Sequence, residues 1–281
     1  MRVAVLGASG FLGRRLTAAL RARGDQPLAL SLRDPEAAAR ASDGCDAVVN
    51  LAGAPVSARW TNRQKAAILA SRTTLPHRFL DAAARLERPP GAYVSASAIG
   101  YYGTSRTATF TEASPPGEDF LARVCVAWEA EADRARELGM RVARIRTGIA
   151  LGAEGGALAR LLPLFRAGLG GVVASGRQWY SWIHADDVVG IYLHVLDGRA
   201  DGALNATAPE PVTNAGFTRA LAAALRRPAI FPVPAFAVGA LLGEAAMIVT
   251  EGQRVVPGRT LESGYAFRHP HLDEALRDLT R

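Results

Sequence analysis

A glycine-rich turn directly follows the first apolar segment of the chain and constrains the fold more than any other feature. The segment Arg2–Leu6 is typical of a buried strand, and Phe11–Arg23 has the spacing of a helix. Between them the sequence reads Gly7-Ala8-Ser9-Gly10-Phe11-Leu12-Gly13. Such a turn lets the backbone approach a diphosphate, and the helix N-terminus offers free N–H groups to it. Its position between a strand and a helix favours a dinucleotide site over a tight turn without a ligand.

The first 150 residues alternate short apolar runs with helical patterns, which indicates strand–helix–strand units and a parallel sheet. Right-handed crossovers between such strands place helices on both faces of the sheet. We therefore expect an α/β fold, a Rossmann-like doubly wound parallel sheet with a smaller C-terminal lobe. The expected strands are 2–6, 28–32, 47–51, 92–97 and 141–145, and the expected helices are 11–23, 61–86, 118–138, 215–226, 235–249 and 272–279.

The composition changes after Gly148, where glycine and proline become more frequent and the apolar and helical segments become shorter. We expect residues 1–150 to form the nucleotide-binding domain, with its sheet extended by parts of 170–210. Residues 151–281 are expected to form a mixed substrate lobe that ends in a helical domain at about 228–281. The most apolar tract, 229–249, is interrupted by prolines and a glutamate, so it predicts a buried helix and not a membrane span.

The charge and the cysteine count exclude several classes of protein. There are 33 basic and 26 acidic side chains and a formal net charge of +7, but the basic residues are scattered and not clustered in a stripe. A nucleic-acid surface is therefore not expected. No membrane partner is expected either, because the most apolar tract is interrupted. The two cysteines cannot form a disulfide framework or a four-cysteine zinc site. With no targeting segment recognised at the N-terminus, a cytoplasmic location is expected.

The end of the second strand discriminates between NAD and NADP. Here the sequence reads Ser31-Leu32-Arg33-Asp34. The planar guanidinium of Arg33 suits a 2′-phosphate, which favours NADP(H). In the alternative, Arg33 is solvated and Asp34 contacts the ribose. The small residues of Asn50-Leu51-Ala52-Gly53 at the end of the third strand allow a close approach to the adenine side of a dinucleotide, or simply make a tight turn.

These motifs resemble the extended short-chain dehydrogenase/reductase superfamily, and in particular its atypical epimerase-family branch with a C-terminal domain of unknown function. The branch shares Arg59-Trp60, Ser71-Arg72, the run from Ser95 to Gly103, Trp128-Glu129, Arg146-Thr147-Gly148 and the run from Gly176 to Asp187. The resemblance implies a Rossmann-like fold, NADP(H) binding and an unassigned substrate. The expected cofactor-binding residues are Gly7, Ser9, Gly10, Phe11, Leu12, Gly13, Leu32, Arg33, Leu51, Ala52, Gly53, Arg72, Ser95 and Ile149.

The chain departs from the superfamily in its acid/base residues. Ordinary members use a Tyr-x-x-x-Lys pair, in which the lysine lowers the tyrosine pKa and the tyrosine exchanges a proton during hydride transfer. Lys65 is the only lysine, and no tyrosine precedes it by four positions. In the matching helix, either register places Phe120 or Leu121 at the tyrosine and Val124 or Cys125 at the lysine.

Ser97, Tyr101 and Tyr102 are the remaining catalytic candidates, because they follow the strand that ends at the expected nicotinamide position. Ser97 would polarise a substrate oxygen and one tyrosine would donate a proton; in the alternative, both tyrosines pack as ordinary aromatic residues. Cys125 lacks a visible base. His184 is expected to have a structural role beside a helix cap formed by Asp186-Asp187, and no metal site is expected at His269-Pro270-His271.

Three functions are compatible with these residues. The first is an NADP(H)-dependent oxidoreductase acting on a small carbonyl or alcohol. The second is a nucleotide-sugar epimerase or dehydratase that uses its cofactor transiently. The third is a non-catalytic regulator, related to cell division by analogy, that senses NADP(H) and binds a protein partner. The substrate and the oligomeric state stay open.

Overall fold

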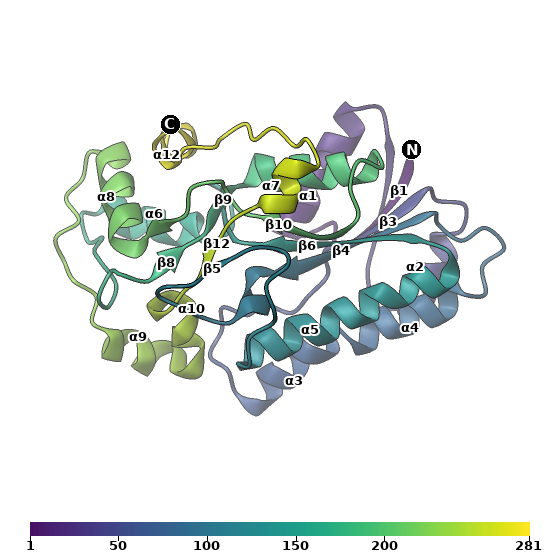
Figure 1. The fold of residues 1–281 in the computed structure, drawn as a ribbon, viewed down its shortest axis with the longest axis horizontal. Helices are drawn as coiled ribbons and strands as arrows, with labels where there is room; N and C mark the ends of the chain where they lie inside the picture. Colours follow the sequence, from purple (N-terminus) through teal and green to yellow (C-terminus); the bar gives the residue numbers. More distant parts are fainter.

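The computed structural model describes residues 1–281, and a six-stranded parallel sheet forms its centre (Figure 1). The strand order is β10-β6-β4-β3-β1-β2. This order, with the crossover between β1 and β3, is that of a Rossmann-like sheet, and the predicted fold class is confirmed. The strands are β1 (Arg2–Leu6), β2 (Gln26–Leu30), β3 (Ala47–Asn50), β4 (Ala92–Ala98), β6 (Arg141–Thr147) and β10 (Gly202–Ala206).

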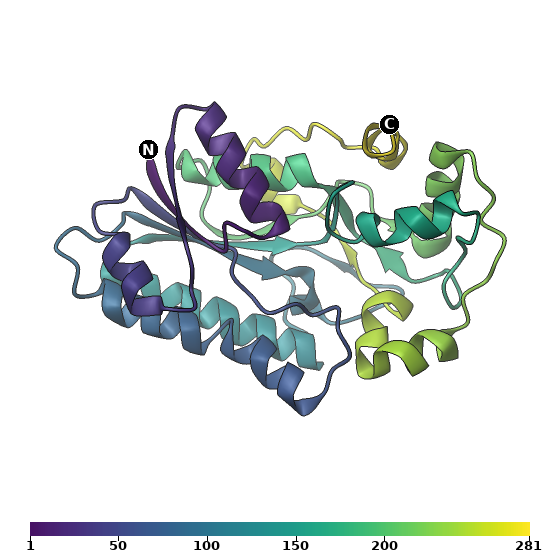
Figure 2. The ribbon, with the colours of Figure 1, turned by 180° about the vertical axis from the view of Figure 1, so that it is seen from behind.

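Helices cover both faces of this sheet (Figure 2). On one face, α1 (Phe11–Ala22) and α7 (Ala185–Leu196) bury their apolar side chains against β1, β3, β4 and β6. On the other face, α2 (Pro35–Ala41), α4 (Thr74–Ala83) and α5 (Phe120–Asp133) enclose a second core. β1 and β3 are therefore buried on both faces, which explains their apolar runs.

Two long helices of the sequence prediction are interrupted in the structure. The expected helix 61–86 divides into α3 (Asn62–Ala70) and α4. Pro76 explains the division, because proline lacks an N–H and is tolerated only in the first turn of a helix. The expected helix 118–138 is α5 followed by a 3₁₀ helix, η2 (Arg134–Leu138).

The C-terminal half adds short strand pairs and a third core. β7 (Ile149–Leu151) pairs with β9 (Trp182–His184), β8 (Trp179–Tyr180) with β11 (Val212–Thr213), and β5 (Thr109–Phe110) with β12 (Arg254–Val255). Helices α6 (Leu158–Arg166), α8 (Asn214–Leu225) and α12 (Leu272–Leu279) pack around this core. The sequence patterns missed α2 and α6.

The prediction of one buried helix in the apolar tract 229–249 was wrong. The tract forms α9 (Ala235–Leu242), a 3₁₀ turn η3 (Gly243–Ala246) and α10 (Met247–Thr250), and α9 has no buried residue. Gly243 at a φ of +60° ends α9, since residues other than glycine rarely adopt this conformation. None of the helices has the length and apolar character needed to cross a membrane.

Asp187 in the first turn of α7 fixes the segment that leads from α11 (Gly258–Glu262) to α12. Its buried carboxylate accepts hydrogen bonds from the Tyr265 hydroxyl at 3.0 Å and from the backbone N–H groups of Arg268 at 2.7 Å and His269 at 2.9 Å. The carboxylate also lies at the positive end of the α7 dipole. One acidic side chain thus connects the C-terminal segment to the sheet domain.

We predict that Asp187→Asn lowers the free energy of unfolding by about 2–3 kcal/mol, because the new amide group faces backbone donors. Urea unfolding measures the loss. Asp186→Asn is the control, since Asp186 pairs with Arg15 at a partly exposed position and should change stability by no more than about 1 kcal/mol. Equal losses in the two variants would contradict the assigned role of Asp187.

Candidate functional site

The glycine turn brings β1, α1 and the end of β3 into close backbone contact. Gly7 has a φ of +82°, and a Cβ on it would lie 2.9 Å from the Ala52 nitrogen. A Cβ on Gly13 would lie 2.2 Å from the Gly7 carbonyl oxygen, so a side chain at either position displaces the backbone. Gly10 is the N-cap of α1 and supplies no side-chain hydrogen bond. The N–H groups of the first turn therefore remain available to an anionic ligand.

Phe11, Leu12 and Ser9, which the sequence predicted to touch the cofactor, hold the turn in place through packing and a backbone contact. The Phe11 ring packs under a glycine segment, where a Cβ on Gly152 or Gly155 would lie 2.4 Å or 2.3 Å from it. Leu12 packs against the core beneath α1. The exposed Ser9 accepts a hydrogen bond from Arg14 through its carbonyl oxygen at 2.7 Å. These contacts fix the turn from both sides.

At the end of β2, the arginine and the aspartate of the sequence prediction have different roles. The Arg33 side chain is exposed and has no partner in the chain. The Asp34 carboxylate accepts a hydrogen bond from the Ala37 N–H at 3.0 Å and caps α2. Leu32 is buried in the core beside α2. The guanidinium is thus free for a ligand, whereas the carboxylate is engaged.

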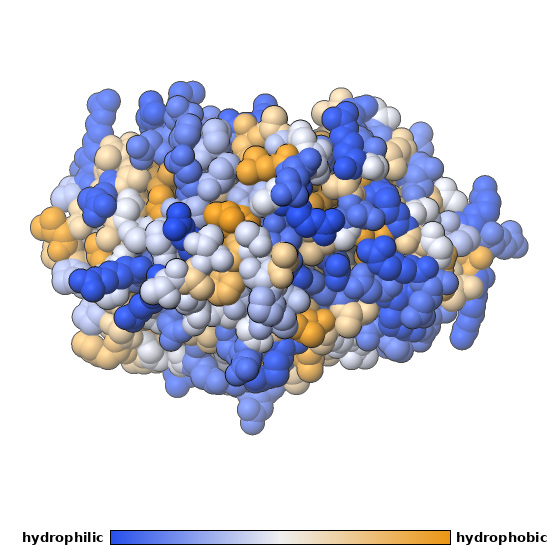
Figure 3. Space-filling view, viewed as in Figure 1, coloured by the Kyte–Doolittle hydropathy of each residue, from blue (hydrophilic) through white to orange (hydrophobic).

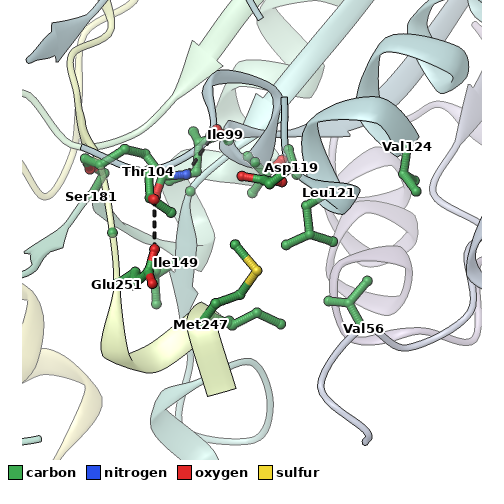
Figure 4. Close-up of a pocket in the computed structure, with 18 of the residues that line it drawn as sticks. Val56, Ile99, Thr104, Asp119, Leu121, Val124, Ile149, Ser181, Met247 and Glu251 are labelled. Carbon is green, nitrogen blue, oxygen red and sulfur yellow. Dashed lines mark hydrogen bonds between the residues drawn. The ribbon is translucent and has the colours of Figure 1, made fainter. Parts of the chain in front are cut away.

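A cavity of about 340 Å³ lies at the carboxyl ends of β4 and β6 (Figure 4). Its wall is mainly apolar, with Val56, Leu121 and Val124 on one side and Met247 of α10 on another. Of the predicted cofactor residues, Arg72 and Ile149 line it, next to the Gly148 turn. Such a cavity at the carboxyl edge of a parallel sheet is the usual place for a ligand in this class of fold.

Arg72 is the only basic residue in the cavity wall, and no carboxylate pairs with it. Its Nη1 donates to the carbonyl oxygens of Ala54 at 3.0 Å and Ile68 at 3.2 Å, and its guanidinium carbon lies 4.8 Å from the centre of the Trp128 ring. Desolvation lowers the pKa of Arg72. An unpaired cation with free N–H groups suits a phosphate or another anion.

Ser97 and Tyr102, two of the catalytic candidates, lie together in a buried polar network. The Ser97 hydroxyl donates to Glu129 at 2.7 Å, and Glu129 accepts two further hydrogen bonds from Arg146 at 2.7 and 2.8 Å. Arg146 donates to the Tyr102 hydroxyl at 2.9 Å, which donates to Asn205 at 2.7 Å. Neither Ser97 nor Tyr102 is part of the cavity wall.

The electrostatics of these candidates favour a structural role. Burial raises the pKa of Tyr102 to about 12, despite the Arg146 charge. The ring of Tyr101 lies 3.5 Å from the Arg146 guanidinium carbon and is likewise absent from the cavity wall. Ser95, predicted to touch the cofactor, is buried and donates to the Ala96 carbonyl oxygen at 2.9 Å. Their assignment to catalysis or cofactor binding stays a prediction.

The cavity contains polar residues that the sequence analysis did not single out. The Thr104 hydroxyl donates to the Glu251 carboxylate at 2.8 Å, and both side chains line the cavity (Figure 4). Asp119 also lines it, while one of its oxygens caps α5 by accepting from the Ala122 N–H at 2.9 Å. No spacing in the sequence connects Thr104 with Glu251, which are 147 positions apart.

Cys125 and His184 are accounted for by packing and capping. Cys125 is buried, and desolvation raises its pKa to about 12, so it is a poor nucleophile. His184, and not the predicted aspartates, caps α7, because its Nδ1 accepts from the Asp186 N–H at 3.0 Å. His184, Asp186 and His269 have ligand atoms within 4.8 Å of one another. With Nδ1 as acceptor, however, the neutral ring carries its proton on Nε2, which does not suit a metal.

We predict that Glu129→Gln lowers the free energy of unfolding by about 3–5 kcal/mol, because it leaves the buried Arg146 charge without its carboxylate. Ser97→Ala should cost less, about 1–2 kcal/mol, since it removes one hydrogen bond. Chemical denaturation measures both values. Glu131→Gln on the same helix is the control, because Glu131 pairs with Arg134 at a partly exposed position. A comparable loss in the control would contradict the prediction.

Comparisons with known proteins agree with this geometry. Residues 3–207 match the NAD dependent epimerase/dehydratase family, and residues 233–279 match a domain of unknown function, DUF1731. The chain is 42% identical to the chloroplastic epimerase family protein SDR39U1 homolog of Arabidopsis thaliana, over 99% of this chain and 86% of the relative. It is 39% identical to human epimerase family protein SDR39U1, over 99% of both chains.

Solved structures extend the comparison to three dimensions. The crystal structure of human SDR39U1 (isoform 2) with NADPH superposes with a TM-score of 0.91 at 36% identity, over 99% of both chains. A UDP-glucose 4-epimerase from Thermotoga maritima has a TM-score of 0.82 at 17% identity, which shows a shared fold only. The chain belongs to the NAD dependent epimerase/dehydratase family.

Proposed function

We propose that this protein binds NADP(H) and is an oxidoreductase that acts on a small carbonyl or alcohol in the apolar cavity. The observation that carries the proposal is the open N-terminus of α1 beside the Gly7–Ala52 contact, at the same sheet edge as the cavity. The human relative crystallised with NADPH supports the choice of cofactor. Arg33, free at the end of β2, supplies a cation where a 2′-phosphate is distinguished from a hydroxyl.

The bound cofactor would supply the hydride, and the chain would position the substrate and exchange a proton. Thr104 and Glu251 are suited to the proton exchange, because their hydrogen bond lies in the cavity wall. In the direction of alcohol oxidation, the Glu251 carboxylate would accept the hydroxyl proton of Thr104 while that hydroxyl takes up the proton of the substrate hydroxyl. In carbonyl reduction the protons would move the opposite way, from protonated Glu251 to Thr104 and from Thr104 to the substrate oxygen. Both residues are exposed, so the pair lies at the solvent-facing side of the cavity and can also exchange protons with water.

We predict that Arg33→Ala raises the Kd for NADPH roughly tenfold and leaves the Kd for NADH almost unchanged. The reason is that Arg33 would contact only the 2′-phosphate, through a charge-assisted hydrogen bond. Isothermal titration calorimetry on ligand-stripped protein measures both constants. Arg40→Ala is the control, because Arg40 is also exposed but lies in the last turn of α2, away from the end of β2. Equal affinities for the two nucleotides, unaffected by Arg33→Ala, would contradict the NADP preference.

We predict that Glu251→Gln and Thr104→Val each lower kcat by about 10²-fold and leave the Kd for NADPH unchanged, as expected for loss of acid/base catalysis. The assay follows NADPH absorbance over a panel of aldehydes and ketones. Glu244→Gln is the control, since Glu244 is exposed on η3 and does not line the cavity. Tight NADPH binding without turnover on any carbonyl would instead favour the non-catalytic, cofactor-sensing alternative.

A further inference from the structure

The end of the molecule formed by α9 and the connection from α8 carries an exposed apolar surface. Ile230, Phe231, Phe236 and Leu241 expose 73%, 51%, 80% and 74% of their area. The segment after α6 runs beside this connection, since the Ala174 N–H donates to the Val233 carbonyl oxygen at 2.9 Å, and it adds Leu169. We call Leu169, Ile230, Phe231, Phe236 and Leu241 the apolar end surface. Apolar colouring at the left end of Figure 3 marks its place.

The segments that build this end of the molecule contain arginine but no acidic residue. Residues 155–185 and 211–243 include no aspartate or glutamate. They hold six exposed arginines that take part in none of the ion pairs of the structure. These are Arg160, Arg166, Arg177, Arg219, Arg226 and Arg227.

Acidic groups do approach from neighbouring elements. Glu244 on η3 follows α9 and is paired with Lys65. Helix α12 packs against α8 and carries Asp273, Glu274 and Asp278. Arg226 and Arg227 at the far end of α8 lead directly into the apolar connection. The positive charge is therefore unbalanced where the apolar side chains are most exposed.

We propose that the apolar end surface docks on an anionic lipid bilayer. Large apolar side chains flanked by arginine are typical of protein segments that lie in the interface of a membrane. Guanidinium groups bind lipid phosphates through paired hydrogen bonds, and the negative surface potential of the bilayer attracts them. Helix α9 has eight residues, so it lies in the interface and does not span the bilayer.

The same charges argue against a second copy of the chain as the occupant. A two-fold symmetric interface places the same surface of both copies face to face. Arginines of one copy would then meet arginines of the other, and these segments offer no carboxylate to balance them. Like charges in contact are unfavourable, whereas a phosphate-bearing bilayer neutralises them.

Docking in this orientation also has a consequence for the cavity. Helix α9 leads through η3 into α10, whose Met247 and Ile248 line the cavity. The membrane-facing helix and one wall of the cavity are thus separated by a single turn of chain. Contact of α9 with a bilayer would therefore be transmitted through η3 to this wall of the cavity.

The test is co-sedimentation of the full chain with two kinds of vesicle at low and high salt. One kind is phosphatidylcholine alone, and the other is phosphatidylcholine with phosphatidylglycerol in a two-to-one ratio. We expect binding to the anionic vesicles only, weakening as salt rises. Phe236→Ser with Leu241→Ser should weaken binding at least tenfold, and Arg226→Gln with Arg227→Gln roughly fivefold for each arginine.

Matched controls come from exposed residues elsewhere. Leu261→Ser on α11, where Leu261 is 47% exposed, and Arg40→Gln on α2 should leave vesicle binding unchanged. Circular dichroism and NADPH affinity verify that every variant is folded. No binding to anionic vesicles, equal binding to both vesicle types, or equal loss in the controls would overturn the proposal. A dimer in analytical ultracentrifugation that Phe236→Ser dissociates would also overturn it, in favour of a second copy.

Discussion

The buried pair of Glu129 and Arg146 is the interaction on which the arrangement around the cavity depends. Glu129 comes from α5 and Arg146 from β6, and both side chains are only 4% exposed. Removing two charges from water costs several kcal/mol each, so the pair persists only because every atom has partners. Ser97 and Tyr102 are such partners, and Asn205 extends the network to β10. The pair thereby joins α5 to β4, β6 and β10 of the sheet. Ala98 and Thr147, which follow Ser97 and Arg146 in the chain, line the cavity.

The same network shows that the loss of the Tyr-x-x-x-Lys pair is accompanied by a different role for the whole of helix α5. Leu121 and Val124 turn an apolar surface toward the cavity from α5, while Glu129, further along that helix, points to the sheet. The Ser97 hydroxyl is thereby committed to a carboxylate instead of a substrate oxygen. Helix α5 provides packing and internal charge pairing, and the acidic groups of the cavity are Asp119 and Glu251.

Sequence patterns predicted the parts of the structure that depend on local chemistry. The glycine turn, five of the six strands of the central sheet and α12 follow from short-range rules on backbone approach and apolar periodicity, whereas β10 was expected only as part of a sheet extension within 170–210. Three features did not follow. Thr104 and Glu251 meet only through the fold, and His184 displaced the predicted aspartates as the cap of α7. For α9, hydropathy indicated burial, but the helix has no fully buried residue, and of its side chains only Leu242 packs against a core, the small cluster around Trp60.

Arg72 supplies a positive charge to the cavity, where helix α5 has no lysine to do so. Its guanidinium reaches the cavity from the α3–α4 junction, and Gly53 leaves room for it, since a Cβ there would lie 3.0 Å from Nη2. An arginine keeps its charge at every physiological pH, so it can hold an anion but cannot exchange a proton. In the superfamily's usual site, a single lysine both binds the ribose and tunes the proton donor. In the proposed oxidoreductase, charge and proton transfer would be divided between Arg72 and a second cavity group such as Glu251.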